Sequence, residues 1–449
     1  MKKRNVREAA LDLLLAIEKK QAYSHLQLKA YIEKHDLSPK DIGLLTELVY
    51  GTIQRKMTLD YYLSHFLKTT SKLSDWVIPL LRISLYQMVY LNRIPDRAVL
   101  YEAVEIAKKR GHPGIASFVN GVLRNVQRKG LPPIDVINDP LERISIKTST
   151  PKWLVERLSK QYGLGETEKI LLAQLSPARQ TARVNRLKAD VPQVLQALVE
   201  EGIDAKKGKL ADEAIYAVKG NLAKSKAYKN GWITIQDESS MLVAKALNVK
   251  EGDHVLDACA APGGKSTHIG EILNNTGKVV CLDLHEHKIQ LIEKQAHRLG
   301  LANVEARVLD SRFVAEHFPP STFDKILVDA PCSGFGVIRK KPEIKYTKTK
   351  EGIFSLISVQ KEILRAASHL LKPNGILVYS TCTIDREEND GVIKSFLQDH
   401  EDFELDDTMS ERMPVQVKQY IEGGKLQILP HYFETDGFFI AALRKKVGS

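Results

Sequence analysis

The hydrophobic positions along the chain follow three successive patterns. In residues 4–130, apolar side chains recur every three or four positions, which is the spacing of the buried face of a helix. The recurring positions are Val6, Ala9, Ala10, Leu13, Leu14, Ile17, Leu44, Leu45, Leu48, Val49, Leu80, Leu81, Ile83, Leu85, Met88, Val89, Val99, Ala103, Val104 and Ile106. Pro95 and Gly111-His112-Pro113-Gly114 interrupt them. The pattern predicts an all-helical first domain over residues 1–130.

Residues 131–230 mix prolines, helical spacing and alternating spacing. The stretch from Leu131-Pro132-Pro133 to Pro151 is typical of a linker, which we place at 131–150. Beyond it, the pattern predicts a helix at 151–162, a strand at 181–185, a helix at 191–201 and a strand at 215–218. Residues 151–230 therefore form a small α+β segment in our prediction.

From about residue 231 onward, apolar strand-like runs alternate with helical runs, which favours a parallel sheet covered by helices on both faces. The predicted strands are 255–257, 279–283, 304–309, 326–329 and 376–379. Two further runs, 426–429 and 438–443, have no clear helix between them, and we expect an antiparallel edge pair. The third domain is thus α/β and spans 231–449.

Length, composition and charge fit a multi-domain globular protein with a polyanionic partner. A chain of 449 residues suits two to four domains. The net charge of +11 favours nucleic acid, although it also fits a solvated basic surface. Basic side chains flank the helical domain at Lys2, Lys3, Arg4, Arg7, Arg124, Arg128 and Lys129. We interpret the α+β segment as an RNA guide surface because of Arg179, Arg183, Arg186, Lys188, Lys206, Lys207, Lys209, Lys224, Lys226 and Lys229.

The cysteines and the N-terminus predict a reducing compartment. The 4 cysteines form no C-x-x-C pair and have no histidine at zinc-ligand spacing, so we expect no metal site. So few cysteines in so long a chain are typical of the cytoplasm. Met1-Lys2-Lys3-Arg4 resembles the start of a signal peptide, but Glu8 and Asp12 interrupt the apolar stretch that such a peptide needs. No apolar run approaches the roughly 20 residues of a membrane span, so we expect a cytoplasmic protein.

A glycine-bearing turn is the strongest local motif. Asp257-Ala258-Cys259-Ala260-Ala261-Pro262-Gly263-Gly264-Lys265-Ser266 links a predicted strand to a predicted helix. Its two glycines do not complete a G-x-G-x-x-G dinucleotide motif. A P-loop needs glycine where Cys259 stands. A turn that binds an adenosyl cofactor without phosphates and a purely structural turn both remain open.

Aspartates at the predicted strand ends favour the cofactor. Four predicted strands end in aspartate, at Asp257, Asp283, Asp310 and Asp329. Ligands of open α/β sheets bind beyond the carboxyl ends of the strands. Asp283 could bind a ribose, and Asp310 could lie beside an adenine. A row of carboxylates repels phosphates, so these residues indicate S-adenosyl-L-methionine.

Two cysteines follow neighbouring predicted strands. Asp329-Ala330-Pro331-Cys332-Ser333-Gly334 follows one, and Ser380-Thr381-Cys382-Thr383 follows the next, so both thiols should face one crevice. Addition of a thiolate to carbon 6 of cytosine makes carbon 5 nucleophilic enough to accept a methyl group. Asp329 is placed to bond ring nitrogen 3. Two buried structural cysteines are the alternative.

This constellation resembles the RNA cytosine-5 methyltransferase family over residues 231–449, which implies a Rossmann-like class I methyltransferase domain. The resemblance implies that Cys382 is the nucleophile, that Cys332 assists product release, and that Lys265 lies near Asp329 and the base. It implies cofactor binding by Cys259, Ala260, Ala261, Pro262, Gly263, Gly264, Lys265, Asp283, Asp310 and Asp329. The segment 339–345 resembles one near the target base, but lacks its usual Pro-Asp.

The helical domain resembles the NusB family of RNA-binding proteins. The resemblance rests on the stretches Leu81–Gln87, Glu102–Glu105 and Phe118–Arg124. A NusB-like domain ahead of this methyltransferase core resembles the RsmB type, which implies a 16S (small-subunit) ribosomal RNA substrate. A transfer RNA methyltransferase and a non-catalytic ribosome-assembly or antitermination factor remain alternatives. We expect a monomer with no membrane partner.

Overall fold

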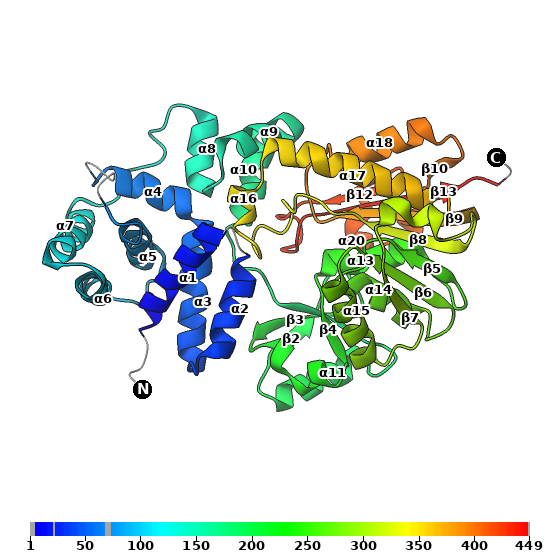
Figure 1. Cartoon of the computed structure of the whole chain (residues 1–449), viewed down its shortest axis with the longest axis horizontal. Helices are drawn as coiled ribbons and strands as arrows, with labels where there is room; N and C mark the ends of the chain where they lie inside the picture. The colour runs from blue at the N-terminus through cyan, green and yellow to red at the C-terminus, as the bar shows by residue number, and fades with distance from the viewer. Residues whose placement is uncertain (1–4, 21–22, 68–72, 448–449) are drawn as a thin grey trace. The chain divides into compact units, whose positions relative to one another are not determined.

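The computed structural model describes residues 5–20, 23–67 and 73–447, and the predicted basic residues Lys2, Lys3 and Arg4 lie outside these ranges. The chain forms two compact units (Figure 1). The first contains residues 1–176 and 338–347, and the second contains residues 177–337 and 348–449. Within the described ranges, no helix has both the length and the apolar character needed to cross a membrane.

The first unit is helical, as the spacing of its apolar residues predicts. Its helices are α1 (Val6–Lys20), α2 (Ser24–Lys34), α3 (Pro39–Gln54), α4 (Lys56–Ser64), α5 (Val77–Tyr90), α6 (Asp96–Arg110), α7 (Pro113–Lys129), α8 (Pro140–Thr148), α9 (Lys152–Tyr162), α10 (Leu164–Ala173) and α16 (Ile344–Thr347). Local sequence sets several ends: the Ser38 side chain caps α3, and Gly130 in a positive-φ conformation ends α7. The predicted apolar positions Leu13, Leu48 and Leu81 lie in its core.

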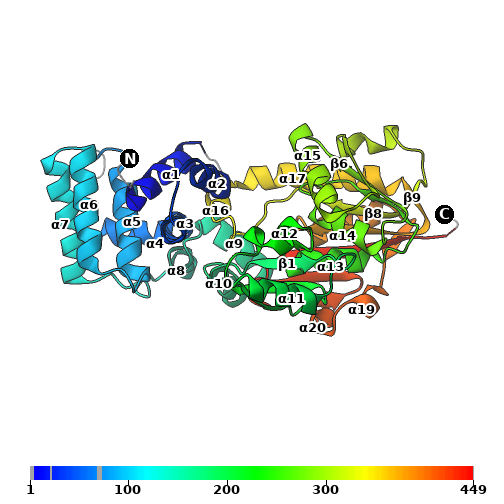
Figure 2. The ribbon, with the colours of Figure 1, turned by 90° about the horizontal axis from the view of Figure 1, so that it is seen from below.

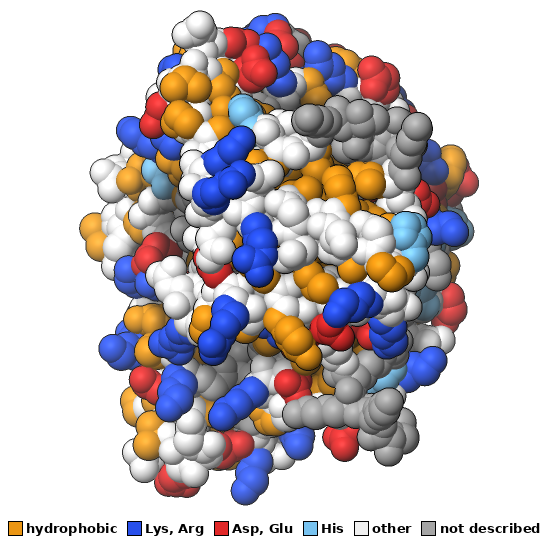
Figure 3. All heavy atoms as spheres, turned by 90° about the vertical axis from the view of Figure 1, so that its left-hand side faces the viewer, with side chains coloured by type: hydrophobic (Ala, Val, Ile, Leu, Met, Phe, Trp, Pro, Cys, Tyr) orange, Lys and Arg blue, Asp and Glu red, His pale blue; other side chains and the backbone are white. Residues whose placement is uncertain are grey.

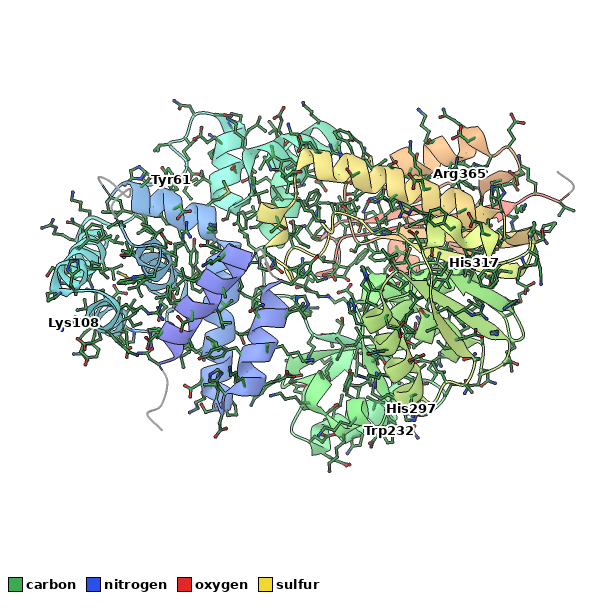
Figure 4. The ribbon with its side chains drawn as sticks, viewed as in Figure 1. Tyr61, Lys108, Trp232, His297, His317 and Arg365 are labelled. Atoms are coloured by element: carbon green, nitrogen blue, oxygen red, sulfur yellow. The ribbon has the colours of Figure 1, made fainter. Side chains whose placement is uncertain are left out.

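The predicted linker at 131–150 is only partly a linker, because α8 occupies its second half. Asp139 caps this helix, and Pro140 is its first residue, so the prolines that suggested an irregular segment include one that starts a helix. Tyr61 of α4, labelled in Figure 4, donates from its hydroxyl to the carbonyl oxygen of Pro133 at 2.9 Å. This part of the chain therefore packs within the helical unit.

A ten-residue insertion, Ile338–Thr347, leaves the second unit and joins the first. Glu343 accepts hydrogen bonds from the backbone nitrogen (3.1 Å) and hydroxyl (2.8 Å) of Ser24, the first residue of α2. Lys345 donates to the carbonyl oxygens of Gln54 and Thr148, the last residues of α3 and α8. The Glu343 carboxylate thus meets a helix N-terminus, which matches the helix dipole, and the Lys345 amine donates to the carbonyl groups that end two helices.

The second unit begins with a four-stranded antiparallel sheet in the order β2-β3-β1-β4. Its elements are β1 (Thr181–Val184), α11 (Val191–Glu200), β2 (Asp204–Lys207), β3 (Ala214–Lys219), η1 (Leu222–Lys224), α12 (Lys226–Lys229) and β4 (Ile233–Ile235). The α+β segment that the sequence predicts is thus present, but α9 and α10 group with the helical unit. β2 and β4 were not predicted because they are short and β2 is polar.

One predicted member of the RNA guide surface is wrong. Arg183 is fully buried, and its guanidinium pairs with Glu271 of α14 (Gly264–Ile272) at 2.7 Å. It also donates to the carbonyl oxygen of Gly264 at 2.7 Å. Arg183 therefore fastens the small sheet to the helix that follows the glycine-bearing turn, and it has no surface left for RNA.

The main sheet runs in the order β11-β12-β13-β9-β8-β5-β6-β7, with β10 beside β13. Figure 1 labels β9, β8, β5, β6 and β7 in this order, and Figure 2 shows β6, β8 and β9 of the same sheet from below. Its strands are β5 (His254–Asp257), β6 (Lys278–Asp283), β7 (Val304–Val308), β8 (Phe323–Asp329), β9 (Leu371–Thr381), β10 (Phe403–Leu405), β11 (Ile421–Glu422), β12 (Lys425–Ile428) and β13 (Phe438–Lys445). The five strands β5 to β9 pair in parallel, and each predicted parallel strand overlaps one of them. β12 and β13 are antiparallel as predicted, but β13 lies inside the sheet against β9 rather than at its edge.

Alternate residues of the strands build two cores, one on each face of the sheet. Val279 and Cys281 of β6 belong to one core, while Val280 and Leu282 belong to the other. The first core includes α13 (Glu238–Leu247), α14 and α15 (Glu286–Leu299), and the second includes α17 (Lys350–Ser368) and α18 (Asp390–Asp399). Burial on both faces, at about 1.5–3 kcal/mol per large apolar side chain, explains why these strands are continuously hydrophobic.

Candidate active site

The glycine-bearing turn joins β5 to α14 at the point where the sheet order reverses. β5 lies between β6 and β8, so its carboxyl end is at the switch point where open α/β sheets bind ligands. Gly263 has φ of +98°, and a Cβ added to Gly264 would meet no atom within 4 Å. The turn therefore presents backbone to open space, and the first amides of α14 need an acceptor.

Asp257 holds this turn in place through two hydrogen bonds. It is fully buried and accepts hydrogen bonds from the hydroxyl of Ser266 (2.7 Å) and the backbone nitrogen of Cys259 (3.3 Å). Burial raises the pKa of Asp257 to about 7. The residue was predicted only as one of four strand-end acids, and its place inside the turn gives it a structural task.

The carboxylates of Asp283 and Asp310 differ in how closely each is paired with a neighbouring cation, and therefore in how available each is to a ligand. Asp283 ends β6, where its carboxylate lies 3.2 Å from the ammonium of Lys288. Asp310 lies two residues beyond the end of β7, and its carboxylate is paired with Arg312 at 2.6 Å. The hydrogen bond from Arg312 lowers the pKa of Asp310. The prediction that Asp310 directly ends a strand is therefore wrong by two residues, and a ligand would have to share this carboxylate with Arg312.

Lys265 and Asp329 form an ion pair beside the cysteines. The Lys265 ammonium lies 2.6 Å from one carboxylate oxygen of Asp329, and Ser380 donates to the other oxygen at 2.8 Å. Burial acts to lower the pKa of Lys265, but the attraction of Asp329 outweighs it and the pKa is raised. Cys382 is a further electrostatic neighbour of this ammonium. A cation in this position favours the thiolate form of a nearby cysteine.

The two cysteines meet as the sequence predicts. Cys332 follows β8 and Cys382 follows β9, and their sulfur atoms are 3.4 Å apart without forming a disulfide. The contact with Cys382, together with burial, raises the pKa of Cys332 well above its usual value. Cys259 lies in the glycine-bearing turn, and Cys281 is buried in β6. The pair at the ends of β8 and β9 is thus distinct in its setting from the other two.

Sequence reasoning missed a buried polar cluster directly behind the cysteines. Glu388 and Asn389 are fully buried at the start of α18, and they bond residues next to both cysteines. The only signal in the sequence is the unusually polar run Asp385–Asp390, which resembles an exposed turn.

The segment 339–345 was predicted to lie near the target base, but two of its side chains are buried and bonded within the helical unit. Lys345 is 1% exposed and Glu343 is 4% exposed, and both bond residues of the helical unit. These two side chains cannot contact a base while they hold those bonds.

The hydrogen-bonding groups at the strand ends suit S-adenosylmethionine. Backbone of the turn from Cys259 to Lys265, open beside Gly264, suits close approach of a ligand, and Asp283 supplies an acceptor for hydroxyl groups. Among the described residues, no group of three or more His, Cys, Asp or Glu side chains is arranged to hold a metal ion. Fold and site together define a class I methyltransferase that uses S-adenosylmethionine.

The comparisons with known proteins identify the family. Residues 244–444 match the model of the 16S rRNA methyltransferase RsmB/F family, residues 4–128 match the NusB family, and residues 150–221 match the RsmF/B-like ferredoxin-like domain. The chain is 54% identical over 446 residues to the probable ribosomal RNA small subunit methyltransferase B of Bacillus subtilis, covering 99% of this chain and 100% of that protein. The Synechocystis protein of the same description is 32% identical, over 98% of this chain and 99% of the relative. The chain belongs to the RsmB/F family of 16S rRNA methyltransferases.

Solved structures agree with this assignment. The crystal structure of PH0851 has a TM-score of 0.81 and 27% identity, covering 99% of this chain and 99% of that chain. NSun6 from Pyrococcus horikoshii, solved with the S-adenosylmethionine analogue SFG, has a TM-score of 0.59 and 25% identity, covering 66% of this chain and 98% of that chain. The enzyme class and cofactor that the sequence predicts are confirmed by these relationships.

Proposed function

We propose that this enzyme methylates carbon 5 of a cytidine in 16S ribosomal RNA through a covalent bond between Cys382 and the base. The observation that carries the proposal is the pair of cysteine sulfurs 3.4 Å apart beside the Lys265–Asp329 ion pair. Bound S-adenosylmethionine supplies the electrophilic methyl group, held by the turn from Cys259 to Lys265 and by Asp283, with Asp310 as a further contact.

The first step belongs to Cys382. Its thiolate adds to carbon 6, and the electrons of the carbon 5–carbon 6 double bond move so that carbon 5 becomes the nucleophile. Asp329 accepts hydrogen bonds from both Lys265 and Ser380. We therefore assign the proton that ring nitrogen 3 needs to the Lys265–Asp329 pair, which shares it across a 2.6 Å contact.

The second step belongs to Cys332. After methylation, a base removes the proton from carbon 5, and the bond between carbon 6 and the Cys382 sulfur breaks, which restores the ring and frees the thiolate. The contact with Cys382 is the largest cause of the raised pKa of Cys332. The Cys332 sulfur lies 3.4 Å from that of Cys382, so it is close enough to the adduct to assist this step.

Substitution of each cysteine tests these roles. Cys382→Ala should abolish methyl transfer to 16S RNA, and Cys332→Ala should accumulate a covalent RNA adduct seen as a shifted band on a denaturing gel. Cys281→Ala, which removes a buried sulfur of β6, is the matched control and should retain activity. Adduct formation by Cys382→Ala, or its absence in Cys332→Ala, would show that the roles are assigned wrongly.

We infer that the helical unit and the small sheet bind the RNA, and that the enzyme works as a monomer in the cytoplasm. Arg124, Arg128 and Lys129 of α7 are exposed, and Figure 3 shows Lys and Arg side chains spread over the face of the helical unit where α7 lies. Such a surface suits RNA phosphates. Bisulfite sequencing of 16S and transfer RNA with and without the enzyme separates the two substrates, and sedimentation tests the monomer.

A further inference from the structure

Two consecutive buried residues, Glu388 and Asn389, bond the neighbours of the two cysteines separately. Asn389 accepts a hydrogen bond from the hydroxyl of Thr381 at 2.6 Å and donates to the carbonyl oxygen of Thr383 at 3.2 Å. Thr381 and Thr383 are the residues before and after Cys382. The amide of Asn389 therefore holds both sides of that cysteine.

Glu388 does the same for Cys332. Its carboxylate accepts from the backbone nitrogen of Ser333 at 2.8 Å and from the Ser333 hydroxyl. Gln360 of α17 donates to the same carboxylate and to the carbonyl oxygen of Pro331, both at 2.9 Å. Pro331 and Ser333 are the residues before and after Cys332, so the carboxylate and its glutamine partner hold both sides of the second cysteine.

These two sets of hydrogen bonds, one around each cysteine, are joined to each other and to the sheet. The Ser333 and Thr383 hydroxyl oxygens are 2.7 Å apart, which links the two cysteine loops directly. Tyr379 of β9 donates from its hydroxyl to the carbonyl oxygen of Glu388 at 2.7 Å. Glu388, Asn389 and Gln360 are each fully buried, where an unsatisfied polar group is costly, so the network favours a single arrangement.

We propose that Glu388 and Asn389 are positioning residues that act on different steps: Asn389 aims the Cys382 sulfur for attack on the base, and Glu388 aims Cys332 for release of the product. This inference rests on the proposed roles of the cysteines. Neither residue needs to touch the RNA. Since one bond joins them in the chain, they also fix the separation of the two sulfurs.

Because the two residues act on different steps, their substitutions should change the amount of covalent adduct in opposite directions. In a Cys332→Ala background, where the adduct accumulates, adding Asn389→Ala should slow adduct formation by on the order of 10²-fold, as expected when a nucleophile is misplaced by about 1 Å. In an otherwise wild-type enzyme, Glu388→Gln should instead accumulate the adduct, because release is slowed and attack is not. The KM for RNA should change little in both variants, since neither residue binds RNA.

Two matched variants separate positioning from general damage. Glu387→Gln removes the same charge one residue earlier, on an exposed side chain, and should behave as wild type. Asn389→Asp keeps the acceptor for Thr381 but loses the donor to Thr383, so it should give an intermediate rate of attack with a nearly normal fold. Circular dichroism and thermal melting of every variant check folding.

Three results would each contradict the proposal or the cysteine assignment on which it rests. Adduct formation at the parent rate in both Asn389 variants, or a Glu388→Gln enzyme indistinguishable from Glu387→Gln, would overturn the positioning roles while leaving the cysteine assignment intact. Absence of any adduct in Cys332→Ala alone would overturn the cysteine assignment, and the inference with it.

Discussion

The strand-end site and the insertion Ile338–Thr347 each bury a lysine, but they compensate its charge in opposite ways. Lys265 meets the carboxylate of Asp329, whose attraction outweighs burial and raises the lysine pKa. Lys345 meets only main-chain carbonyl oxygens among its described bonds, at 2.8 Å and 3.4 Å, and burial lowers its pKa to about 7. The active site thus preserves a cation, whereas the insertion uses a lysine mainly as a hydrogen-bond donor.

The largest effect is expected at Lys265, the lysine that keeps its charge. Lys265→Met should lower kcat by about 10²–10⁴-fold, the size typical of a positioned acid–base group, because Asp329 loses its proton partner and Cys382 loses a neighbouring cation. Single-turnover methyl transfer measures this effect. Lys278→Met, which breaks the ion pair with Glu305 at the opposite end of β6, is the control. A kcat unchanged by Lys265→Met would mean that this cation has no chemical task.

Lys345→Met should affect stability and its pH dependence rather than chemistry. The folded pKa of about 7 lies below the ordinary lysine value of 10.5, so the unfolded chain binds more protons between these pH values and stability rises with pH. Each pH unit in this window adds at most about 1.4 kcal/mol to the free energy of unfolding. Lys345→Met should remove this slope, and it should lower stability by about 1–3 kcal/mol at high pH because two buried carbonyls lose a donor.

Urea unfolding at several pH values, followed by the fluorescence of Trp76 and Trp153 in the helical unit, measures the effect of Lys345→Met. The difference between wild type and variant isolates this one lysine from other groups that titrate in the same range. Parallel pH dependence in the two proteins would contradict the lowered pKa.

The smallest effect is expected at Glu343, the anionic anchor of the same insertion. Glu343→Gln keeps the size of the side chain but removes the charge at the N-terminus of α2, which should cost about 0.3–1 kcal/mol. Thermal melting of the helical unit measures it, with Glu33→Gln on the exposed face of α2 as the control. A loss no greater than that of the control would show that the two hydrogen bonds from Ser24 need no charge.

Elements with a local signal could be predicted from the sequence. A continuous apolar run located β6 to within a residue, and the prolines and glycines marked the turn before α14. β2 and β4 could not be predicted, since strands of four and three residues are too short to show a distinctive period, and β2 is also polar and largely exposed. Helix α8 was missed because the same prolines that end helices also start them.

The sequence by itself indicated the residues that we propose carry the chemistry. Asp329 ends β8, Cys332 lies three residues beyond it, and Cys382 directly follows β9, and the carboxyl ends of parallel strands meet at one edge of a sheet. Tertiary structure alone decided which charges are buried and with which residues they pair. Arg183 meets Glu271 across 88 residues, and Ser24 meets Glu343 across 319. The environment of a charge depends on long-range packing, which neither composition nor spacing records, so the positioning residues and the anchors of the insertion became visible only in the folded chain.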